Sequence, residues 1–564
     1  MRILFDSQEI TYKEPFGTLR PGQYCRLHLH IPVSVGTVKT ECILELADGS
    51  VCIRVPLKIE RTEGNYDILS GSFSLRKPGL YFYYFRIYKP DGMFRLFKQG
   101  HDTNMEAGDR WQVTCTPTDF TTPDWAKGAI IYQIFPDRFY KSGDVDLTEK
   151  LQPFTVHKDW NEEVVWQPDK NGVIQNNDFF GGNFRGIAEK MDYIASLGTN
   201  ILYLNPICKS FSNHRYDTAD YKTPDPMLGT ILDFQDMCQA AHKRGIKIIL
   251  DGVFSHTGAR SIYFQSACTS VDSPYFSWYT FYRYPDRYNS WWGFHTLPTV
   301  NKMDPSFLRF IIDDEDSVVA HWLNLGADGF RLDVADELPD TFILRLKKRI
   351  RQIRPDALLM GEVWEDASNK IAYGIRRRYF ADGALDSIMN YPFRTAILDF
   401  IRGQDDGHLL KETVMTIVEN YPPQVLACNM NLLGSHDTVR ILTALDGDRT
   451  KRMMASFLQY TLPGSPSIYY GDEAGLEGQK DPFNRRTYPW GREDQSLIAH
   501  YRHLGKMRNN YSPLRLGNIR FLQAENGRLT FCREYGGKRV TVCINRTGEA
   551  WNNLPPMGFG IWEE

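Results

Sequence analysis

Polar residues that could do chemistry follow four short apolar runs in the middle of the chain. These runs end in Asp251 and His256 (DGVFSH), Arg331 and Asp333 (GFRLDVADE), Glu362 and Trp364 (GEVW), and His436 and Asp437 (GSHD). Taken singly, each residue has an ordinary explanation, because a strand-end Asp often caps a helix and a lone His is usually hydrogen bonded and inert. Together they bring carboxylates, two histidines and an arginine to one place, where burial is costly unless they serve each other or a ligand.

The spacing of Asp333 and Glu362 indicates a particular reaction. They lie one β/α unit apart (362 − 333 = 29 residues), which places them on adjacent strands, ~4.8 Å from each other. Two carboxylates at roughly 5–5.5 Å match a retaining glycosidase, in which one attacks the anomeric carbon and the other protonates the leaving oxygen. Arg331 shares a strand face with Asp333 and is predicted to keep it ionised as the nucleophile. Apolar neighbours of Glu362 suit a general acid.

Two other kinds of site fit part of this set. A divalent metal could be bound by Asp251, His256, Asp333, Glu362 and His436. Barrel metallohydrolases, however, usually add a His-x-His pair or a Lys near the fourth strand, and the sequence has neither there. A phosphate-binding barrel requires a glycine-rich loop near the last strands, which GSHDT matches poorly.

The elements that must position these residues alternate between buried strands and amphipathic helices from Gly128 onward. Eight nearly continuous apolar runs are found at 128–135, 200–207, 246–254, 329–335, 357–364, 385–391, 425–437 and 466–475. Strands buried on both faces and separated by helices indicate parallel βαβ units. Eight such units predict an α/β fold, a closed (β/α)8 TIM barrel with its chemistry at the carboxyl ends of the strands.

The barrel is expected to be the middle one of three domains. Residues 1–120 alternate apolar and polar side chains and predict an N-terminal β-sandwich, followed by a linker rich in Pro, Thr and Asp at 116–125. The barrel occupies 121–505, with an aromatic, helix-poor subdomain, 257–305, inserted after its third strand. Short strands return in 506–564, which predict a small C-terminal β-sandwich.

Composition restricts the partners. The chain has 564 residues, 42% apolar residues and a formal net charge of −3, so nothing favours nucleic acid or an anionic membrane. No apolar run approaches 18 residues, and the start has no signal-peptide pattern, so no membrane span and a cytoplasmic location are expected. The ten cysteines are irregularly spaced, which favours reduced thiols over a disulfide framework.

These motifs, in their order along the chain, resemble the four sequence regions of the α-amylase family, glycoside hydrolase family 13. LPTVN (297–301) resembles a fifth region of its neopullulanase, cyclomaltodextrinase and maltogenic amylase group. SNHRYDTADY, FFGGNFRGI and IYYGDEAG are similar to segments of that group and of the related amylopullulanases. The resemblance is strong over roughly 125–505 and looser in the flanking domains.

The resemblance implies a role for each candidate residue. Asp333 would be the nucleophile, Glu362 the general acid/base and Asp437 a third carboxylate that grips the hydroxyls of the reacting sugar. The implied substrate-binding and supporting residues are Tyr216, which stacks on that sugar, Asp251, His256, Arg331, His436, Trp364 on the aglycone side, and Asp481 and Arg485 near the next sugar on the non-reducing side.

The function implied is retaining hydrolysis of α-1,4 and also α-1,6 links in maltooligosaccharides, cyclodextrins, starch fragments or pullulan. An α-glucosidase of the oligo-1,6-glucosidase type and a non-catalytic carbohydrate-binding relative are the alternatives. The N-terminal domain would bind glucan or cover the active site of a second subunit in a homodimer.

No cofactor is required by this chemistry, although relatives often bind a structural calcium ion after the first strand. Here that loop carries Asp144 and Asp146 without a clear Asn-Asp pair, and a later Gly-Gly-Asp of relatives is replaced by Gly181, Gly182 and Asn183. Ser255 and Asp336 also depart from the pattern, since relatives usually carry Asn at both positions.

Overall fold

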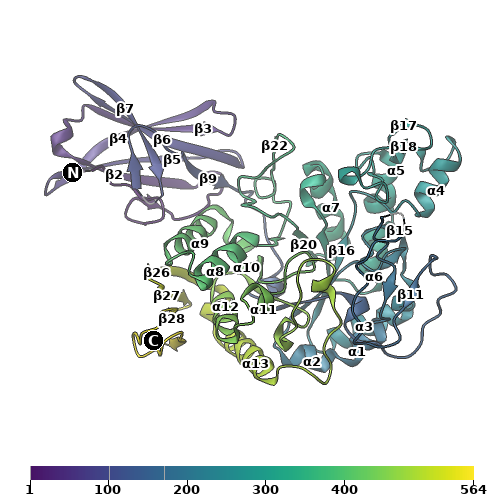
Figure 1. Ribbon diagram of the computed structural model, residues 1–564. Coiled ribbons are helices and arrows are strands. Elements are labelled where there is room, and N and C mark those ends of the chain that lie inside the picture. The colour runs from purple at the N-terminus through teal and green to yellow at the C-terminus, as the bar shows by residue number, and fades with distance from the viewer. Residues whose placement is uncertain (1, 101, 171, 564) are drawn as a thin grey trace. The chain divides into compact units, whose positions relative to one another are not determined.

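The computed structural model describes residues 2–100, 102–170 and 172–563. It divides the chain into two compact units, both of which can be followed in Figure 1. The first unit consists of Met1–Thr121, Glu365–Leu385 and His408–Leu426. The second unit consists of Thr122–Trp364, Asp386–Gly407 and Ala427–Glu564. Two connections between barrel strands therefore pack with the N-terminal strands.

The N-terminal strands form one antiparallel sheet that folds over its own core. They are β1 (Lys13–Glu14), β2 (Tyr24–Pro32), β3 (Lys39–Leu46), β4 (Val51–Glu63), β5 (Tyr66–Ser74), β6 (Gly79–Lys89), β7 (Gly92–Gln99), β8 (Asp102–Asn104) and β9 (Trp111–Cys115). The long strand β4 pairs with β3 as far as Leu57 and with β5 from Lys58 onward, and the second pairing has a bulge between Ile59 and Arg61. Bulges bend a strand, so the two layers of the predicted sandwich are continuous through β4.

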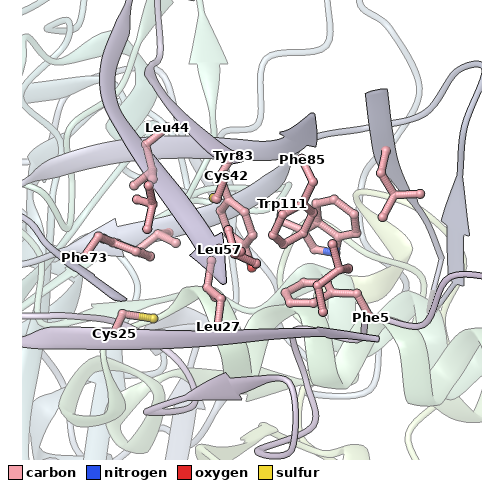
Figure 2. Close-up of a cluster of buried hydrophobic side chains, with 14 of the residues drawn as sticks. Phe5, Cys25, Leu27, Cys42, Leu44, Leu57, Phe73, Tyr83, Phe85 and Trp111 are labelled. Atoms are coloured by element: carbon pink, nitrogen blue, oxygen red, sulfur yellow. The ribbon is translucent and has the colours of Figure 1, made fainter. Parts of the chain in front are cut away.

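The space between the two layers is filled by aliphatic and aromatic side chains, some of which Figure 2 shows. Phe5 lies 5.0 Å from Trp111 and 4.9 Å from Phe85, measured between ring centroids, and Tyr83 stacks on Trp111 at 5.7 Å. These rings are buried. Many aromatic side chains of this domain therefore belong to its hydrophobic core.

Eight parallel strands form the barrel of the second unit. In chain order they are β10 (Ile131–Ile134), β13 (Ile201–Leu204), β16 (Lys247–Gly252), β19 (Gly329–Leu332), β20 (Leu358–Gly361), β23 (Ser387–Ile388), β24 (Met430–Leu432) and β25 (Ser465–Tyr469). Their order in the sheet is β23-β20-β19-β16-β13-β10-β25-β24, and a parallel bridge from Met389 to Met430 closes the circle. Each strand falls in one of the eight predicted runs, so the predicted barrel is confirmed.

Helices follow most of these strands. They are α1 (Phe184–Glu189), α2 (Met191–Ser196), α3 (Ile231–His242), α6 (Val318–Leu325), α7 (Asp340–Ile353), α8 (Tyr391–Arg402), α9 (His408–Asn420), α10 (Pro423–Cys428), α11 (Ile441–Ala444), α12 (Arg449–Thr461), α13 (Gln495–Asn510) and α14 (Ser512–Leu516). A capping box between Thr230 and Asp233 begins α3, satisfying amide groups that the first helical turn leaves free. Helices in the described ranges are all too short or too polar to span a bilayer.

Some local predictions differ from the structure. The run expected as one strand from 425 begins with the end of α10, and only β24 pairs with neighbouring strands. The connection from β20 to β23 contains the short hairpin β21 (Ile371–Ala372) and β22 (Ile375–Arg376) where a helix was expected. The insertion at 257–305 is poor in α-helix, as expected: it contains α4 (Ile262–Thr269) and the hairpin strands β17 (Phe281–Arg283) and β18 (Arg287–Tyr288), and α5 (Pro305–Leu308) begins at its end.

The C-terminal strands form a single four-stranded antiparallel sheet within the described residues, where a sandwich was expected. They are β26 (Asn518–Glu525), β27 (Arg528–Tyr535), β28 (Lys538–Asn545) and β29 (Phe559–Glu563). Asn526-Gly527 and Gly536-Gly537 form the tight turns, with positive φ at both positions of each, as type I′ hairpins require. The boundary predicted at 506 falls inside α13.

One buried ion pair offers a test of how the first unit is held together. Lys13 Nζ lies 3.1 Å from Glu419 Oε1, and both side chains are almost fully buried. Replacing Lys13 by Met leaves Glu419 buried without its partner. We expect the variant to lose about 3 kcal/mol of stability, measured by urea unfolding. The double variant Lys13→Met/Glu419→Gln should recover most of the loss, and an equally unstable double variant would contradict this account.

Candidate active site

The candidate residues extend from the carboxyl ends of the barrel strands. Asp251 lies in β16 and Arg331 in β19, Asp333 comes one residue after β19, and Glu362 comes directly after β20. Leu332 and Gly361 are register partners, so Asp333 and Glu362 occupy the next pair of positions on adjacent strands. At the other end of this strand pair, Gly329 lets β19 and β20 approach closely because it has no side chain. A Cβ atom at that position would lie 2.2 Å from the Leu358 carbonyl oxygen.

Arg331 is the centre of the site. Its Nη1 atom donates to Asp251 Oδ1 at 2.7 Å and to Asp333 Oδ1 at 3.0 Å, and its Nη2 atom lies 2.9 Å from Glu362 Oε2. The guanidinium group is fully buried. One cation therefore joins three carboxylates from three neighbouring strands, and the planar fork of arginine is suited to that geometry.

A strained residue links Asp333 to Glu362 a second time. Val334 has φ 40° and ψ 63°, a left-handed conformation that is unfavourable for a β-branched side chain. In this conformation its backbone N–H donates to Glu362 Oε2 at 2.8 Å. Trp364 Nε1 donates to the other oxygen, Glu362 Oε1, at 3.1 Å. The glutamate is thus held by its own strand and by the residue that follows Asp333.

A chain of neutral hydrogen bonds extends from Asp251 across the barrel. The Tyr216 hydroxyl donates to Asp251 Oδ2 at 2.9 Å and lies 2.6 Å from His436 Nε2. The Gln133 amide nitrogen lies 2.9 Å from His436 Nδ1. Because an amide NH2 group can only donate, Nδ1 accepts and His436 carries its proton on Nε2. The rings of Tyr216 and His436 are stacked, with centroids 5.4 Å apart.

His256 lies at the same mouth, but its hydrogen bonds are already made. Its Nε2 atom lies 3.1 Å from the Tyr216 carbonyl oxygen, and its Nδ1 atom lies 2.8 Å from the Ser255 hydroxyl. A carbonyl can only accept, so Nε2 donates to it and Nδ1 accepts from Ser255. The Tyr216 carbonyl therefore fixes the tautomer of His256, and the Ser255 hydroxyl donates to the ring nitrogen that is left without a proton. Burial lowers the pKa of His256 to about 4, so the ring is neutral at neutral pH.

Asp437, Arg485 and Asp481 form a second, more open group. Arg485 Nη1 lies 2.9 Å from Asp481 Oδ1, and its Nη2 atom lies 3.6 Å from Asp437 Oδ1. Its Nε atom donates to the His436 carbonyl at 3.0 Å, which ties this group to the central network. The Asp437 side chain is 30% exposed, whereas those of Asp251 and Arg331 are fully covered. The structure thus brings all the predicted site residues into one connected set.

Several residues of the site were not predicted from the sequence. Tyr203 donates to Asp251 Oδ2 at 2.7 Å, and the ring of Tyr391 stacks under Trp364 with centroids 3.8 Å apart. In the insertion, Trp291 lies 5.6 Å from His256 and stacks on the exposed Trp292. The tryptophan pair in SWWGF was a usable signal, whereas Tyr203, Gln133 and Tyr391 are of types common at buried strand positions and gave none.

The carboxylates outnumber the cation at the centre, and this changes their protonation. Burial raises the pKa of the Asp333 carboxyl well above its usual value, Arg331 opposes that rise, and the charges of Glu362, Asp251 and Asp437 add to it. Burial also raises the pKa of Asp251 and of Asp437. Arg331 thus lowers the pKa of Asp333, the direction predicted from the sequence, but burial acts more strongly, so the net shift in the ligand-free site is upward.

Two of the residues considered for calcium, Asn183 and Asp146, make local hydrogen bonds. Asn183 Oδ1 accepts from the backbone N–H of Gly186 at 2.8 Å, and its Nδ2 atom donates to the Ser142 carbonyl at 2.8 Å. Asp146 Oδ1 accepts from the backbone N–H and the hydroxyl of Thr148. Across the described residues, no group of three His, Cys, Asp or Glu side chains is arranged to hold a metal ion.

Fold and site together define a class: a closed β/α barrel whose adjacent strands end in a pair of carboxylates, the arrangement that retaining glycosidases use. A sequence profile of the α-amylase catalytic domain matches residues 133–515. The chain belongs to the α-amylase family.

Three similar proteins span different parts of the chain. An amylopullulanase of Thermoanaerobacterium saccharolyticum is 35% identical over 96% of this chain and 48% of its own length. Neopullulanase 2 of Thermoactinomyces vulgaris is 34% identical over 78% of this chain and 74% of its own. The solved type III pullulan hydrolase of Thermococcus kodakarensis matches both chains in full, with TM-score 0.70 and 26% identity. The chain spans half or less of the length of the amylopullulanases that it matches.

The raised pKa of Asp333 predicts a gain in stability on neutralising it. Wild-type Asp333 ionises more easily unfolded than folded, so its contribution to stability is full below the unfolded pKa, about 3.9, and is lost as pH rises above it. Asn does not ionise, so Asp333→Asn should unfold about 2 °C higher near neutral pH, with the gain vanishing near pH 4. Scanning calorimetry of both proteins across this range measures it. Asp119→Asn, at an exposed position, is the control, and a pH-independent gain would refute the explanation.

Proposed function

We propose that the protein hydrolyses α-glucosidic bonds with retention of anomeric configuration. The observation that carries the proposal is the arrangement of Asp333 and Glu362 at equivalent positions of adjacent strands, held by one guanidinium group. That arrangement supplies a nucleophile and a proton donor on neighbouring strands, as a double-displacement mechanism requires.

In the first step, Asp333 attacks the anomeric carbon and Glu362 gives its proton to the departing glycosidic oxygen. In the second step, the Glu362 carboxylate takes a proton from water, and that water displaces Asp333 from the sugar. The raised pKa of Asp333 means that the ligand-free cluster retains a proton above the pH at which an exposed Asp loses its own. The first step needs this proton on Glu362, and substrate binding has to favour that distribution.

The surrounding residues are proposed to bind the sugar chain. Asp437 would accept hydrogen bonds from hydroxyls of the reacting glucose, and Tyr216 would offer it a ring face. Arg485 and Asp481 would hold the next glucose on the non-reducing side. On the leaving-group side, Trp364 is 46% exposed and backed by Tyr391, so it presents a supported aromatic face. His436 and His256 would each donate to the sugar from Nε2 after releasing the Tyr216 hydroxyl and the Tyr216 carbonyl, respectively.

The substrates proposed are maltooligosaccharides, cyclodextrins, starch fragments and pullulan, cleaved mainly at α-1,4 and also at α-1,6 links. Similarity to proteins named amylopullulanase, neopullulanase and pullulan hydrolase supports this range.

Product analysis on pullulan and β-cyclodextrin tests the proposal. We expect wild type to open the ring and to release panose or maltotriose from pullulan, and Asp333→Asn to lower both rates by a factor on the order of 10⁴. Proton NMR of the first product should show the α-anomer, since the mechanism retains configuration.

Two outcomes of this test would overturn the proposal. A wild-type protein that binds these glucans without cleaving them would be a carbohydrate-binding relative. An initial β-anomer would exclude Asp333 as a nucleophile. Asp119→Asn again serves as the control, and it should match wild type on both substrates.

We also propose a cytoplasmic homodimer formed through the N-terminal domain. Exposed apolar side chains on that domain, Tyr24, Val38 and Ile59 among them, support an interface, and ten cysteines without a disulfide support a reducing compartment. Light scattering after gel filtration should give about twice the chain mass of 65.2 kDa. Tyr24→Glu/Ile59→Glu should give a monomer. A wild-type mass of one chain would refute the dimer.

A further inference from the structure

Two segments beside the site are fastened together by several independent contacts. One lies between β10 and β13, around 157–166, and the other follows β25, at 481–492. The Trp160 indole donates to the Tyr488 carbonyl at 2.9 Å, and the Thr487 hydroxyl donates to the Trp160 carbonyl at 2.6 Å. Arg486 donates to both carboxylate oxygens of Glu163 at 2.9–3.2 Å. These contacts fix the position of the first segment at the barrel mouth.

An aromatic pair projects from this junction. Trp166 and Phe483, the outer aromatic pair, have ring centroids 6.1 Å apart and ring planes inclined by 51°. Trp166 is 47% exposed and Phe483 is half-buried. The packing of the segment does not depend on Trp166, because His157 stacks on Phe180 at 3.9 Å and Val164 is buried beneath it. An exposed tryptophan that the local core does not need suggests a role in binding.

The outer aromatic pair is connected to the reacting carboxylates through one short helical turn. Phe483–Arg485 forms that turn. At its far end Arg485 contacts Asp437 and the His436 carbonyl, as described above, and Asp481 precedes it with a side chain 48% exposed. Moving outward from Asp437, one therefore meets the buried Arg485, then the partly exposed Asp481, and then the outer aromatic pair.

The chemistry of this surface fits a pyranose. The C–H face of a glucose ring packs on aromatic faces, and its hydroxyls require charged or polar partners at the rim. Asp481, Glu163 and Arg486 supply such partners, and Arg486 also lies 5.9 Å from the centre of the Phe483 ring. A purely apolar partner would cover these charged groups without offering them any hydrogen bond of its own.

We propose that the outer aromatic pair binds the third glucose on the non-reducing side of the scissile bond, beyond the glucose assigned to Asp481 and Arg485. This inference rests on the proposed function. It makes Trp166 a determinant of the preferred chain length, with no part in the chemical step.

Two chromogenic substrates that differ by one glucose test the assignment. Release of p-nitrophenol from p-nitrophenyl α-maltoside reports binding of two glucoses on the non-reducing side, and from the α-maltotrioside it reports three. Trp166→Ala should raise KM for the maltotrioside about tenfold with kcat unchanged, because the lost contact is made equally in the ground and transition states. Its kinetics on the maltoside should stay within about twofold of wild type. Phe483→Ala should change the same substrate in the same direction, and Trp166→Phe should restore much of the loss.

A matched control and a binding measurement complete the test. Trp562, 41% exposed in the C-terminal sheet, should be replaceable by Ala without effect on either substrate. In the Asp333→Asn background, calorimetry should show maltotriose binding weakened by Trp166→Ala. Equal losses on both chromogenic substrates, or none on either, would overturn the inference while leaving the hydrolase proposal standing. A wild-type protein inactive on every α-glucan would instead remove the function on which the inference rests.

Discussion

The contact between one buried guanidinium and three carboxylates is the interaction on which the rest of the site depends. Arg331 reaches Asp251, Asp333 and Glu362, which lie on or directly after β16, β19 and β20. Only neighbouring parallel strands, ~4.8 Å apart, bring three such side chains within reach of one planar fork. A closed barrel provides those neighbours and excludes water from the strand ends, so the fold is needed for the electrostatics as much as for the shape.

This cluster of charged residues costs free energy in the folded state, and the packing around it compensates for that cost. Burial raises the pKa of Asp333, and Val334 is held in a left-handed conformation so that its N–H reaches Glu362. Each of these costs free energy in the folded state. The hydrophobic interior below, with Ile131, Ile249 and Met360 among its members, supplies the compensating stability.

The sequence was informative wherever a residue type is rare in its setting. Charged residues at the ends of apolar runs are rare, so Arg331, Asp333 and Glu362 could be found before the structure was known. Tyr203 and Tyr391 could not, because an aromatic residue near a buried strand is ordinary and only its partner reveals its use. The end of α10 was taken for a strand because a short apolar stretch has no period that separates helix from strand. The upward shift of the Asp333 pKa was not predicted, because the sequence shows that Arg331 is near but not that Asp333 is buried beside other carboxylates.

The neutral part of the network explains which groups set the charge of the site. His256 has a pKa of about 4, and burial, with Arg331 and Arg485 nearby, lowers the pKa of His436 well below its usual value. Both rings are therefore uncharged across the neutral range, and both carry their proton on Nε2. The Gln133 amide, which can only donate, fixes the tautomer of His436, and the Tyr216 carbonyl, which can only accept, fixes that of His256. Burial raises the pKa values of Asp251, Asp333 and Asp437. The histidines add no positive charge to the site, so Arg331 remains the cation that the three central carboxylates share.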